Sequence, residues 1–546
     1  MQRAASDPEQ DRQPTTPPRK RVARTAGRRA AAVVLIAVAG TAGIGAAAPD
    51  YPARLFDQVV DLVEKQFVDA DSRAVLYEKA ARGLIRELGD PYSELLTPRD
   101  LREFERSTLG RYAGVGMEIL PAGDSIYVGR VFEGSASEAR GLRRGDRLVA
   151  VDGGSIAGFS PDSVVARLRG LPGTPVVVTV ERLTVPAPIT VTLSRATVHV
   201  PAVPYVLVEG GVGYIPIVGF PSTAASDVAR ALEEVAGRGA RGVVLDLRGN
   251  PGGALDQAVD MVGTLVPRGT PAVEIRERAR TQQVRTRTQP VAPVLPTVVL
   301  VDDRSASAAE IVAGALQDHD RAVLVGERTF GKGLAQAVYS VDGGYALKLT
   351  VARWYTPSGR SIHRDRTAGD STRRLSAPTA GEHDSLARFR SAGGRVLLGG
   401  GGITPDVVLA PDTLQGAERA LARALAREGA RVTPALARIA VRLGREVASA
   451  PEATFRLPAD ARAQLRAELS RAGVTVSDTV WNSGAPYLTR LLEQRVADFA
   501  YGQAAARRRA LAFDRPYQVA DSLLHLPSSV PSPEPARLGA VRGLTG

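Results

Sequence analysis

The sequence predicts an α/β protein in which a core of alternating strands and helices, residues 197–410, follows a smaller β-rich domain at 111–196. Strand and helix patterns alternate through the core, which indicates βα units and a mainly parallel sheet. Short β-type runs separated by turn residues fill the β-rich domain. Helical spacing of apolar residues predicts a helical segment at 49–110 and a helical extension at 411–546.

The composition is that of a globular protein, and it excludes several kinds of site. The chain has 546 residues, of which 44% are hydrophobic and 23% charged, enough for several domains. It has no cysteine, which excludes disulfides, thiolate metal sites and cysteine nucleophiles. The five histidines are scattered and form no HExxH pair, so we expect no metal and no cofactor. The net charge of +12 comes largely from dispersed arginines with few aromatic neighbours, so we expect no nucleic-acid partner.

The N-terminal region has the pattern of a membrane-targeting segment. Residues 1–29 carry eight Lys or Arg and three Asp or Glu, which predicts a disordered basic tail. Residues 30–48 are uncharged and directly follow Arg28 and Arg29, as in a signal peptide or an N-terminal anchor. We favour an uncleaved transmembrane anchor over signal cleavage near 46–48; a buried alanine-rich helix is a third interpretation. Either export signal places the remaining chain on the extracytoplasmic, periplasmic side of the cell envelope.

Two strings in the β-rich domain combine glycine turns with predicted strands. "YAGVGMEI", 112–119, places two glycines ahead of a strand, and "GSASEARGLRRGDRLVAVDG", 134–153, places a short helix and a Gly-Asp turn before another. Together they resemble a PDZ domain. The resemblance implies that Val115, Gly116 and Met117 lie in the loop whose N–H groups hold the C-terminal carboxylate of a peptide. The alternative is a generic small β domain with an ordinary glycine turn.

Ser307 lies where a predicted strand turns into a helix, within "VVLVDDRSASAAEIVAGALQD", 298–318. Glu310 follows it by three residues, the spacing of a capping box, so this string alone favours a helix cap. A serine at such a turn is also where an exposed nucleophile belongs, because the helix N-terminus supplies N–H donors for developing negative charge.

Lys332 is one of only five lysines in a chain that otherwise uses arginine for positive charge. Arginine keeps its proton in proteins, whereas burial can make a lysine amine neutral and therefore basic. Gly331 and Gly333 flank Lys332 and permit close backbone approach. No histidine lies in a string of catalytic type, so Lys332 is the candidate general base for Ser307. The alternative is a surface lysine in a turn.

The string "VVLDLRGNPGGAL", 243–255, is a strand, a glycine turn and a helix start. The free N–H groups of such a turn can bind an anion. A phosphate or nucleotide site is the competing interpretation, but the string matches neither GxGxxG nor GxxxxGK[ST]. We therefore take the turn as a candidate wall of an oxyanion hole.

Eight strings occur in one order over residues 51–410: "GDPYS", "YAGVGMEI", "GYIPIVGF", "LDLRGNPGG", "SASAAEIVAGALQD", "GERTFGKGLAQ", "YTPSGRSI" and "GGITPDV". They resemble the C-terminal processing peptidases, serine proteases of family S41. The resemblance implies a PDZ domain inserted beside a crotonase-like α/β core. It implies Ser307 as nucleophile, Lys332 as general base and Gln336, one helical turn past the lysine, as the residue that orients it. Backbone N–H groups of Gly253 and Ala308 would form the oxyanion hole.

The sequence departs from the family pattern at three places. Ala309 replaces the last serine of the usual SASAS run, without expected loss of activity. Residues 365–400 are longer than the usual connection and predict a loop or insertion. The family core leaves 411–546 unexplained, and these helices could serve oligomer contacts, partner binding or regulation, so a homodimer is plausible.

The resemblance implies an envelope endopeptidase that cuts other proteins near their C-termini, with the PDZ domain capturing the substrate end. One competing hypothesis is a non-catalytic PDZ adaptor that binds C-termini and passes them to another protease. A weaker one is a crotonase-like acyl-CoA enzyme, which the export signal and PDZ domain disfavour.

Overall fold

A computed structural model describes the chain between residues 51 and 526. Within these limits it leaves out residues 70, 293, 366–386, 410–413 and 415. The predicted basic tail at 1–29 and the predicted anchor or signal at 30–48 lie outside the described residues. In the part of the chain that is described, no helix combines the length and the apolar character needed to cross a membrane.

The chain forms two compact units, which divide at Tyr77. In the first unit, helix α1 spans Tyr51–Gln66, and helix α2, Arg73–Glu87, begins before the division. Within this unit the Tyr77 hydroxyl donates a hydrogen bond to Asp57 Oδ1 at 2.7 Å. These helices confirm the helical spacing predicted for this part of the sequence.

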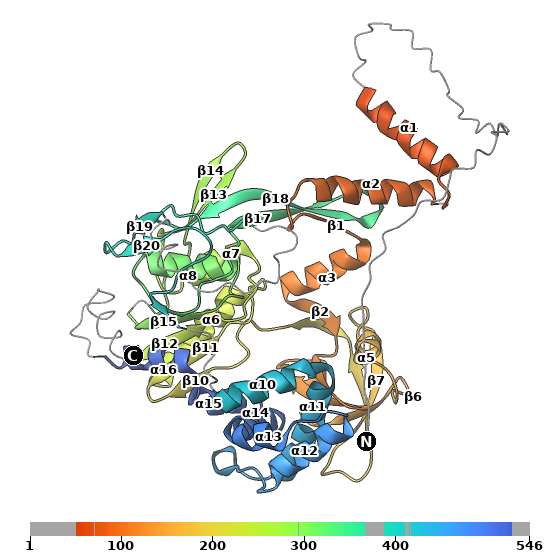
Figure 1. The fold of residues 1–546 in the computed structure, drawn as a ribbon, viewed down its shortest axis with the longest axis vertical. Coiled ribbons are helices and arrows are strands. Elements are labelled where there is room, and N and C mark those ends of the chain that lie inside the picture. Colours follow the sequence, from red (N-terminus) through yellow and green to blue (C-terminus); the bar gives the residue numbers. More distant parts are fainter. Residues whose placement is uncertain are drawn as a thin grey trace, which may run out of the picture. The chain divides into compact units, whose positions relative to one another are not determined.

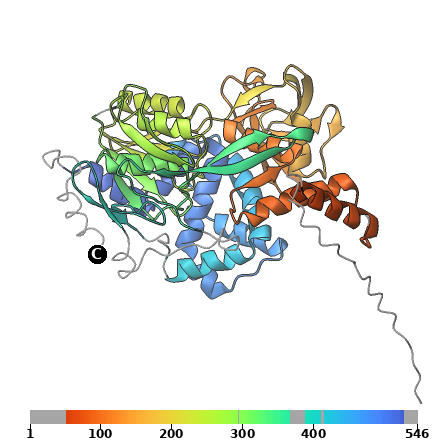
Figure 2. The same ribbon diagram turned by 90° about the horizontal axis from the view of Figure 1, so that it is seen from above.

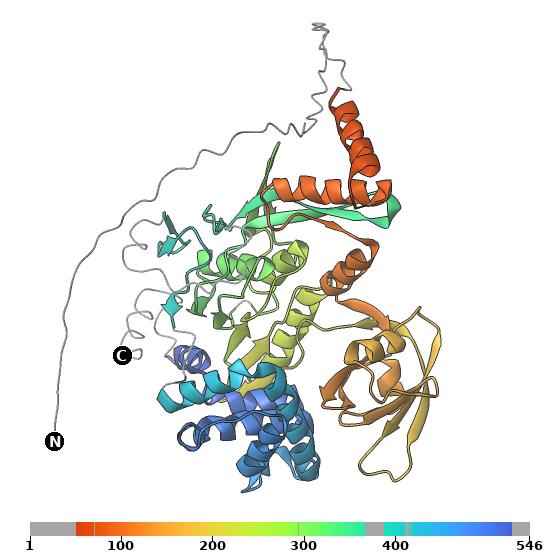
Figure 3. The same cartoon turned by 45° about the vertical axis from the view of Figure 1, so that its right-hand side comes forward.

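The β-rich domain forms a six-stranded antiparallel sheet of order β3-β4-β5-β7-β8, with β6 paired to β5 (Figure 3). Its elements are β3 Met117–Ala122, β4 Ser125–Val131, α4 Ala136–Ala139, β5 Arg147–Val151, β6 Gly154–Ser155, α5 Pro161–Leu168, β7 Pro175–Glu181 and β8 Ile189–Ser194. Alternate valines of β7, Val176, Val178 and Val180, are buried, because a strand with one face on a core has a period of two residues. The predicted β-rich domain is confirmed.

The larger domain is built on a second six-stranded sheet of order β10-β11-β12-β15-β16-β21. Its strands are β10 Leu207–Glu209, β11 Val212–Pro216, β12 Gly242–Asp246, β15 Thr297–Val301, β16 Val323–Gly326 and β21 Val407–Val408. All pairs except β10 with β11 are parallel. Strands β11, β12 and β15 are buried at every position, as expected for parallel strands covered on both faces. The predicted parallel core is confirmed.

Helices cover both faces of this sheet (Figure 1). One face packs against α6 Ala224–Gly237, α7 Leu255–Val262 and α8 Ala308–Asp318, and the other against α16 Arg515–Leu524. Alternate strand residues divide between the two faces: Val243 and Leu245 face the first set, and Val244 faces α16. Helix α6 was not among the predicted elements, and α16, predicted as part of a separate extension, packs on the core sheet.

A third sheet joins the segment before the β-rich domain to the core. Its strands are β1 Glu94–Leu96, β13 Pro271–Glu277, β14 Thr281–Arg285, β17 Leu334–Ser340 and β18 Ala346–Tyr355. Strand β1 pairs with β18, and Figure 2 shows β17 and β18 as a long hairpin. Helix α3, Pro98–Leu109, follows β1, and strand β2, Arg111–Gly114, then pairs with β9, Ala196–His199. The chain therefore contacts the core on both sides of the β-rich domain, which is an insertion.

The C-terminal region is helical, as predicted. Its helices are α10 Gly416–Arg427, α11 Gly429–Val447, α12 Ala461–Arg471, α13 Asp478–Ser483, α14 Ala485–Tyr501, α15 Gln503–Leu511 and α16. Helices α10 to α14 share one hydrophobic core and form a bundle (Figure 3). In the predicted loop at 365–400, the described residues contain a short hairpin of β19 Arg388–Arg390 and β20 Val396–Leu398.

Candidate active site

Ser307 lies in the turn between β15 and α8, as the sequence predicted, and its backbone is strained. Its φ of 56° and ψ of −115° are rare for a residue with a side chain, and such strain persists only where the surroundings enforce it. The N–H of Ala306 donates to Asn250 O at 2.9 Å, and the N–H of Glu310 donates to Ser307 O at 2.8 Å. The turn is thus held on both sides of Ser307.

Glu310 connects the serine turn to the lysine loop. Its carboxylate is fully buried, with 0% exposure, and accepts the N–H of Ser307 at 2.8 Å. The same oxygen, Oε2, accepts the N–H of Lys332 at 2.9 Å. The other oxygen accepts the Gly331 N–H at 2.7 Å and the Thr329 hydroxyl at 2.6 Å. From the sequence, Glu310 was predicted only as a capping-box residue. Its spacing from Ser307 gives no indication that the lysine loop also donates hydrogen bonds to it.

Lys332 is partly buried beside an aromatic ring. Its Nζ lies 5.0 Å from the centroid of the Tyr92 ring, and its carbonyl oxygen accepts the Trp354 indole N–H at 3.1 Å. Burial lowers the pKa of Lys332, and the positive charge of Lys348 lowers it further. Both effects favour the neutral amine, the form in which a lysine can accept a proton.

Replacing Lys348 with methionine is expected to raise the pKa of Lys332, because it removes a repelling positive charge. If neutral Lys332 is the base, kcat/KM rises with pH through this pKa. The rising limb of the pH profile should therefore move to higher pH in Lys348→Met. The measurement is kcat/KM for a fluorogenic peptide across the alkaline range, and Lys348→Arg, which keeps the charge, should leave the limb in place.

The glycine turn lies against Ser307. A Cβ atom built on Gly252 would be 2.8 Å from Ser307 Cβ and 2.9 Å from the Ala308 nitrogen. The Asn250 side chain holds the turn by accepting the Gly252 N–H at 2.8 Å and donating to Ile217 O at 2.7 Å.

The two amides implied as oxyanion donors border this contact. Among the residues that the structure describes, the N–H groups of Gly253 and Ala308 have no hydrogen-bond partner. Unpartnered N–H groups beside a serine are what an oxyanion hole requires. The structure therefore brings the sequence-predicted glycine turn and the predicted nucleophile together.

Gly252→Ala is expected to lower kcat at least about 100-fold, because displacement of the reacting groups by an ångström can have an effect of this size. The new methyl group would push on Ser307 and on the Ala306 carbonyl, 2.7 Å away. Gly249→Ala is the matched control: its φ is also positive, at +70°, but its Cβ would approach nothing closer than 3.6 Å. Steady-state kinetics on both folded variants checks the difference, and equal losses would contradict a special role for the contact.

Gln336 is not one helical turn from Lys332, which corrects the sequence-based expectation. It lies in strand β17 beside a β-bulge, because this segment pairs with β18 instead of forming a helix. Its Nε2 donates to Thr350 Oγ1 at 3.2 Å. The N–H of Thr350 in turn donates to Ser93 Oγ at 3.0 Å, so Gln336 is tied to the "GDPYS" turn.

This turn, residues 89–93, is also part of the site. From the sequence it was identified only as one of the strings that resemble the family. It supplies Tyr92, which packs on Lys332, and Asp90, which accepts the Ser93 hydroxyl at 2.6 Å. Burial acts to raise the pKa of Asp90, but hydrogen bonds from Ser93, Thr350 and the Tyr92 amide hold it below its ordinary value. A cavity of about 630 Å³ opens beside the turn, lined also by His363 and Arg353. Tyr92 gave no signal in the sequence beyond its place in that motif.

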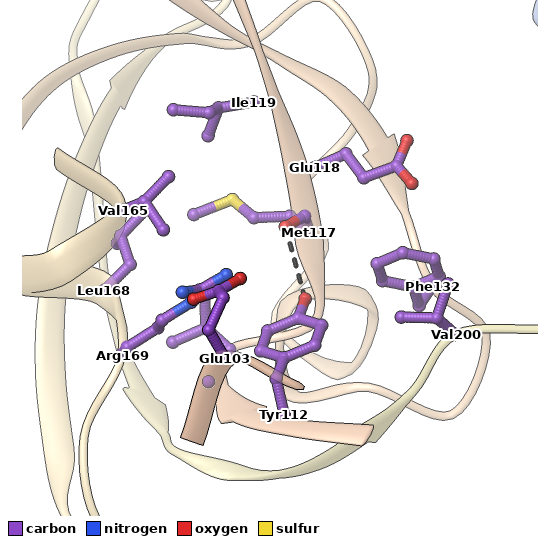
Figure 4. Close-up of a pocket in the computed structure, with 12 residues that line it drawn as sticks. Glu103, Tyr112, Met117, Glu118, Ile119, Phe132, Val165, Leu168, Arg169 and Val200 are labelled. Atoms are coloured by element: carbon purple, nitrogen blue, oxygen red, sulfur yellow. Dashed lines mark hydrogen bonds between the residues drawn. The ribbon is translucent and has the colours of Figure 1, made fainter. Parts of the chain in front are cut away.

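The β-rich domain contains a groove of about 500 Å³ between β3 and α5 (Figure 4). Met117, Ile119, Val165 and Leu168 give it an apolar lining. At one end, the carbonyls of the glycine loop are held: Val115 O accepts the Ser137 hydroxyl at 2.7 Å.

Among the described residues, the N–H groups of Val115 and Gly116 have no hydrogen-bond partner, as a carboxylate-binding loop requires. The Tyr112 hydroxyl donates to Met117 O at 3.4 Å across the same end of the groove. Of the three predicted loop residues, Val115 and Met117 thus line the groove, and Gly116 lies between them in the chain.

Comparison with known proteins agrees with this architecture. The model of peptidase family S41 matches residues 211–372, and the PDZ domain model matches 104–181. The chain belongs to the carboxy-terminal processing proteases of peptidase family S41, with a PDZ domain.

Two curated relatives support this assignment. A carboxy-terminal-processing protease of Bartonella bacilliformis is 34% identical over 313 residues, 56% of this chain and 71% of that protein. The carboxy-terminal processing protease CtpA of Bacillus subtilis is 32% identical over 289 residues, 53% of this chain and 62% of the relative. Among solved structures, a photosystem II D1 C-terminal processing protease is 28% identical and covers 66% of this chain and 94% of its own, with a TM-score of 0.35.

Proposed function

We propose that the protein is a serine endopeptidase that cleaves other proteins near their C-termini with a Ser307/Lys332 dyad. The observation that carries the proposal is the buried carboxylate of Glu310, one oxygen of which accepts the backbone N–H of both residues. The strained backbone of Ser307 and the lowered pKa of Lys332 also support it.

The chemistry follows from these groups. The neutral amine of Lys332 takes the hydroxyl proton of Ser307 as the oxygen attacks the scissile carbonyl. The N–H groups of Gly253 and Ala308 stabilise the negative oxygen of the tetrahedral intermediate. As the carbon–nitrogen bond breaks, the ammonium of Lys332 protonates the leaving amine. Water then hydrolyses the acyl-enzyme, with Lys332 again acting as the base. Gln336 helps to position Lys332 indirectly, because it is tied through Thr350 to the turn that carries Tyr92.

The groove of the PDZ domain would bind the C-terminal end of the substrate. A C-terminal carboxylate would accept N–H groups of the loop at Val115, Gly116 and Met117, while the last side chains occupy the apolar groove. Its partners would be extracytoplasmic proteins, reached through an export signal or membrane anchor at 30–48. A homodimer is compatible with the helical regions at both ends. No metal or cofactor takes part in this mechanism.

An inhibitor that forms a covalent bond with an activated serine tests the proposal directly. A fluorophosphonate should label the full-length protein once, with the adduct on Ser307 by peptide mass spectrometry, and the unlabelled protein should degrade casein. Labelling of another residue would move the nucleophile elsewhere. Binding of C-terminal peptides without labelling or cleavage would support the adaptor hypothesis instead.

A further inference from the structure

Asp514, the N-cap of α16, forms a bidentate ion pair with Arg248, which follows strand β12 at the beginning of the glycine turn. Arg248 Nη1 donates to Asp514 Oδ1 at 2.9 Å, and Nη2 donates to Oδ2 at 2.8 Å. The partners are 266 residues apart in the chain. Asp514 lies beyond the residues that the S41 family model matches, 211–372.

Arg248 also binds Asp246, the last residue of strand β12, from which the turn starts. Its Nε and Nη2 donate to the two oxygens of Asp246 at 2.9 and 2.6 Å, and its backbone N–H donates to Asp246 Oδ1 at 3.0 Å. The next residue, Gly249, donates its N–H to Asp302 Oδ1 at 2.8 Å. Arg248 is thus a clamp between Asp514 and the first residues of the turn.

Arg507 of α15 completes the group. It donates to Asp514 Oδ2 at 2.5 Å and to Asp246 Oδ2 at 3.3 Å, and its guanidinium lies 4.8 Å from the Tyr214 ring centroid. The charges of two acidic and two basic side chains therefore cancel at this site, where the side chains of Asp246 and Asp514 are each 9% exposed. Burial acts to raise the pKa of Asp514, but Arg248 and Arg507 hold it below its ordinary value, so the group is charged at neutral pH.

Asp514 is itself fixed in place. Its side chain accepts the Tyr517 N–H at 3.2 Å and caps α16, a role that aspartate fills well. Tyr517, Val519, Ala520 and Leu523 of this helix are buried against the central sheet. The carboxylate therefore cannot withdraw from Arg248 without loosening a helix that covers the sheet.

We propose that Asp514 is a positioning residue of the active site, which fixes the glycine turn through Arg248. The proposal rests on the proposed function for its effect on catalysis. It assigns a role to the end of the C-terminal region: without Asp514, Arg248 is held on one side only, and the amides of the turn lose their fixed position. A displacement of about an ångström at such donors is enough to lower a rate by 10- to 100-fold.

The experiment compares Asp514→Asn with Arg508→Gln in the full-length protein. Arg508 lies next to Arg507 and makes ion pairs at the same interface, with Glu209 at 2.7 Å and with Glu452, but it does not contact Arg248. Hydrogen exchange of residues 248–254 and steady-state cleavage are measured in both variants. We expect Asp514→Asn to speed exchange in this segment and to lower kcat about 10- to 100-fold with KM within about twofold, and Arg508→Gln to change neither.

The two readouts separate this proposal from the proposed function. If the wild-type protein cleaves nothing, the proposed function fails, and the exchange rates alone decide the role of Asp514. Unchanged exchange in Asp514→Asn, or equal effects in both variants, overturns the proposal. If Asp514→Asn does not fold, Arg248→Lys replaces it, because lysine keeps the charge but cannot bind both acids through a planar fork. The same outcomes then apply.

Discussion

Lys332→Arg is expected to lower the rate of protein cleavage by about 10⁴-fold or more, to the level of Ser307→Ala. Arginine is similar in length to lysine and carries the charge of its protonated form, so binding of substrate should persist, but its guanidinium does not release a proton near neutral pH. The wild-type amine is partly buried and has a lowered pKa, so it can be neutral when the serine attacks. The effect should therefore fall on kcat and not on KM.

The double variant of Ser307→Ala and Lys332→Arg should be no slower than either single variant, because residues that act as one unit give non-additive losses. Lys348→Arg is the matched control: it changes a lysine of strand β18, paired with Glu94 at 3.0 Å, and should keep nearly full activity. Single-turnover cleavage of casein measures all four proteins. Full-rate cleavage by Lys332→Arg would exclude this lysine as the base.

The layout of the fold was predictable from the sequence because its signals are local. The alternation of strand and helix patterns predicted the mainly parallel core sheet, and short β-type runs separated by turn residues predicted the β-rich domain. Helix α6 also has helical apolar spacing, with Val228, Leu232 and Val235 all buried, so the signal for this helix is present in the sequence. The docking of α16 on the core sheet could not be predicted, since it depends on contacts across the whole length of the chain.

The position of Ser307 in the fold was predictable because it depends on a local pattern, whereas the contacts between candidate site residues were not, because they join segments far apart in the sequence. The sequence alone indicates a lysine between two glycines and a serine at a strand-to-helix turn as candidate site residues. By contrast, a glutamate three residues past a serine predicts only a cap, although Glu310 also binds the loop of Lys332. Gln336 was assigned a helical position because spacing alone does not reveal that its segment pairs with β18.

Glu310→Gln is expected to lower kcat at least about 100-fold and to destabilise the fold by about 3 kcal/mol, because the buried carboxylate serves several donors at once. An amide has one acceptor oxygen, so donors now shared between both oxygens would face an NH₂ group. The amides of Ser307 and Lys332 would lose the atom that now holds them together.

The pH profile distinguishes this role from a purely structural one. The negative charge of Glu310 acts to raise the pKa of Lys332, so Glu310→Gln should lower that pKa and move the rising limb of kcat/KM to lower pH. This is opposite in direction to the shift expected for Lys348→Met. Glu468→Gln is the control: Glu468 is also buried, at 4% exposure, but it pairs with Arg438 and Arg471 in the helical bundle. Glu468→Gln should lower stability without shifting the rising limb of the pH profile. If Glu310→Gln gives the same profile as Glu468→Gln, Glu310 is only a buried helix cap.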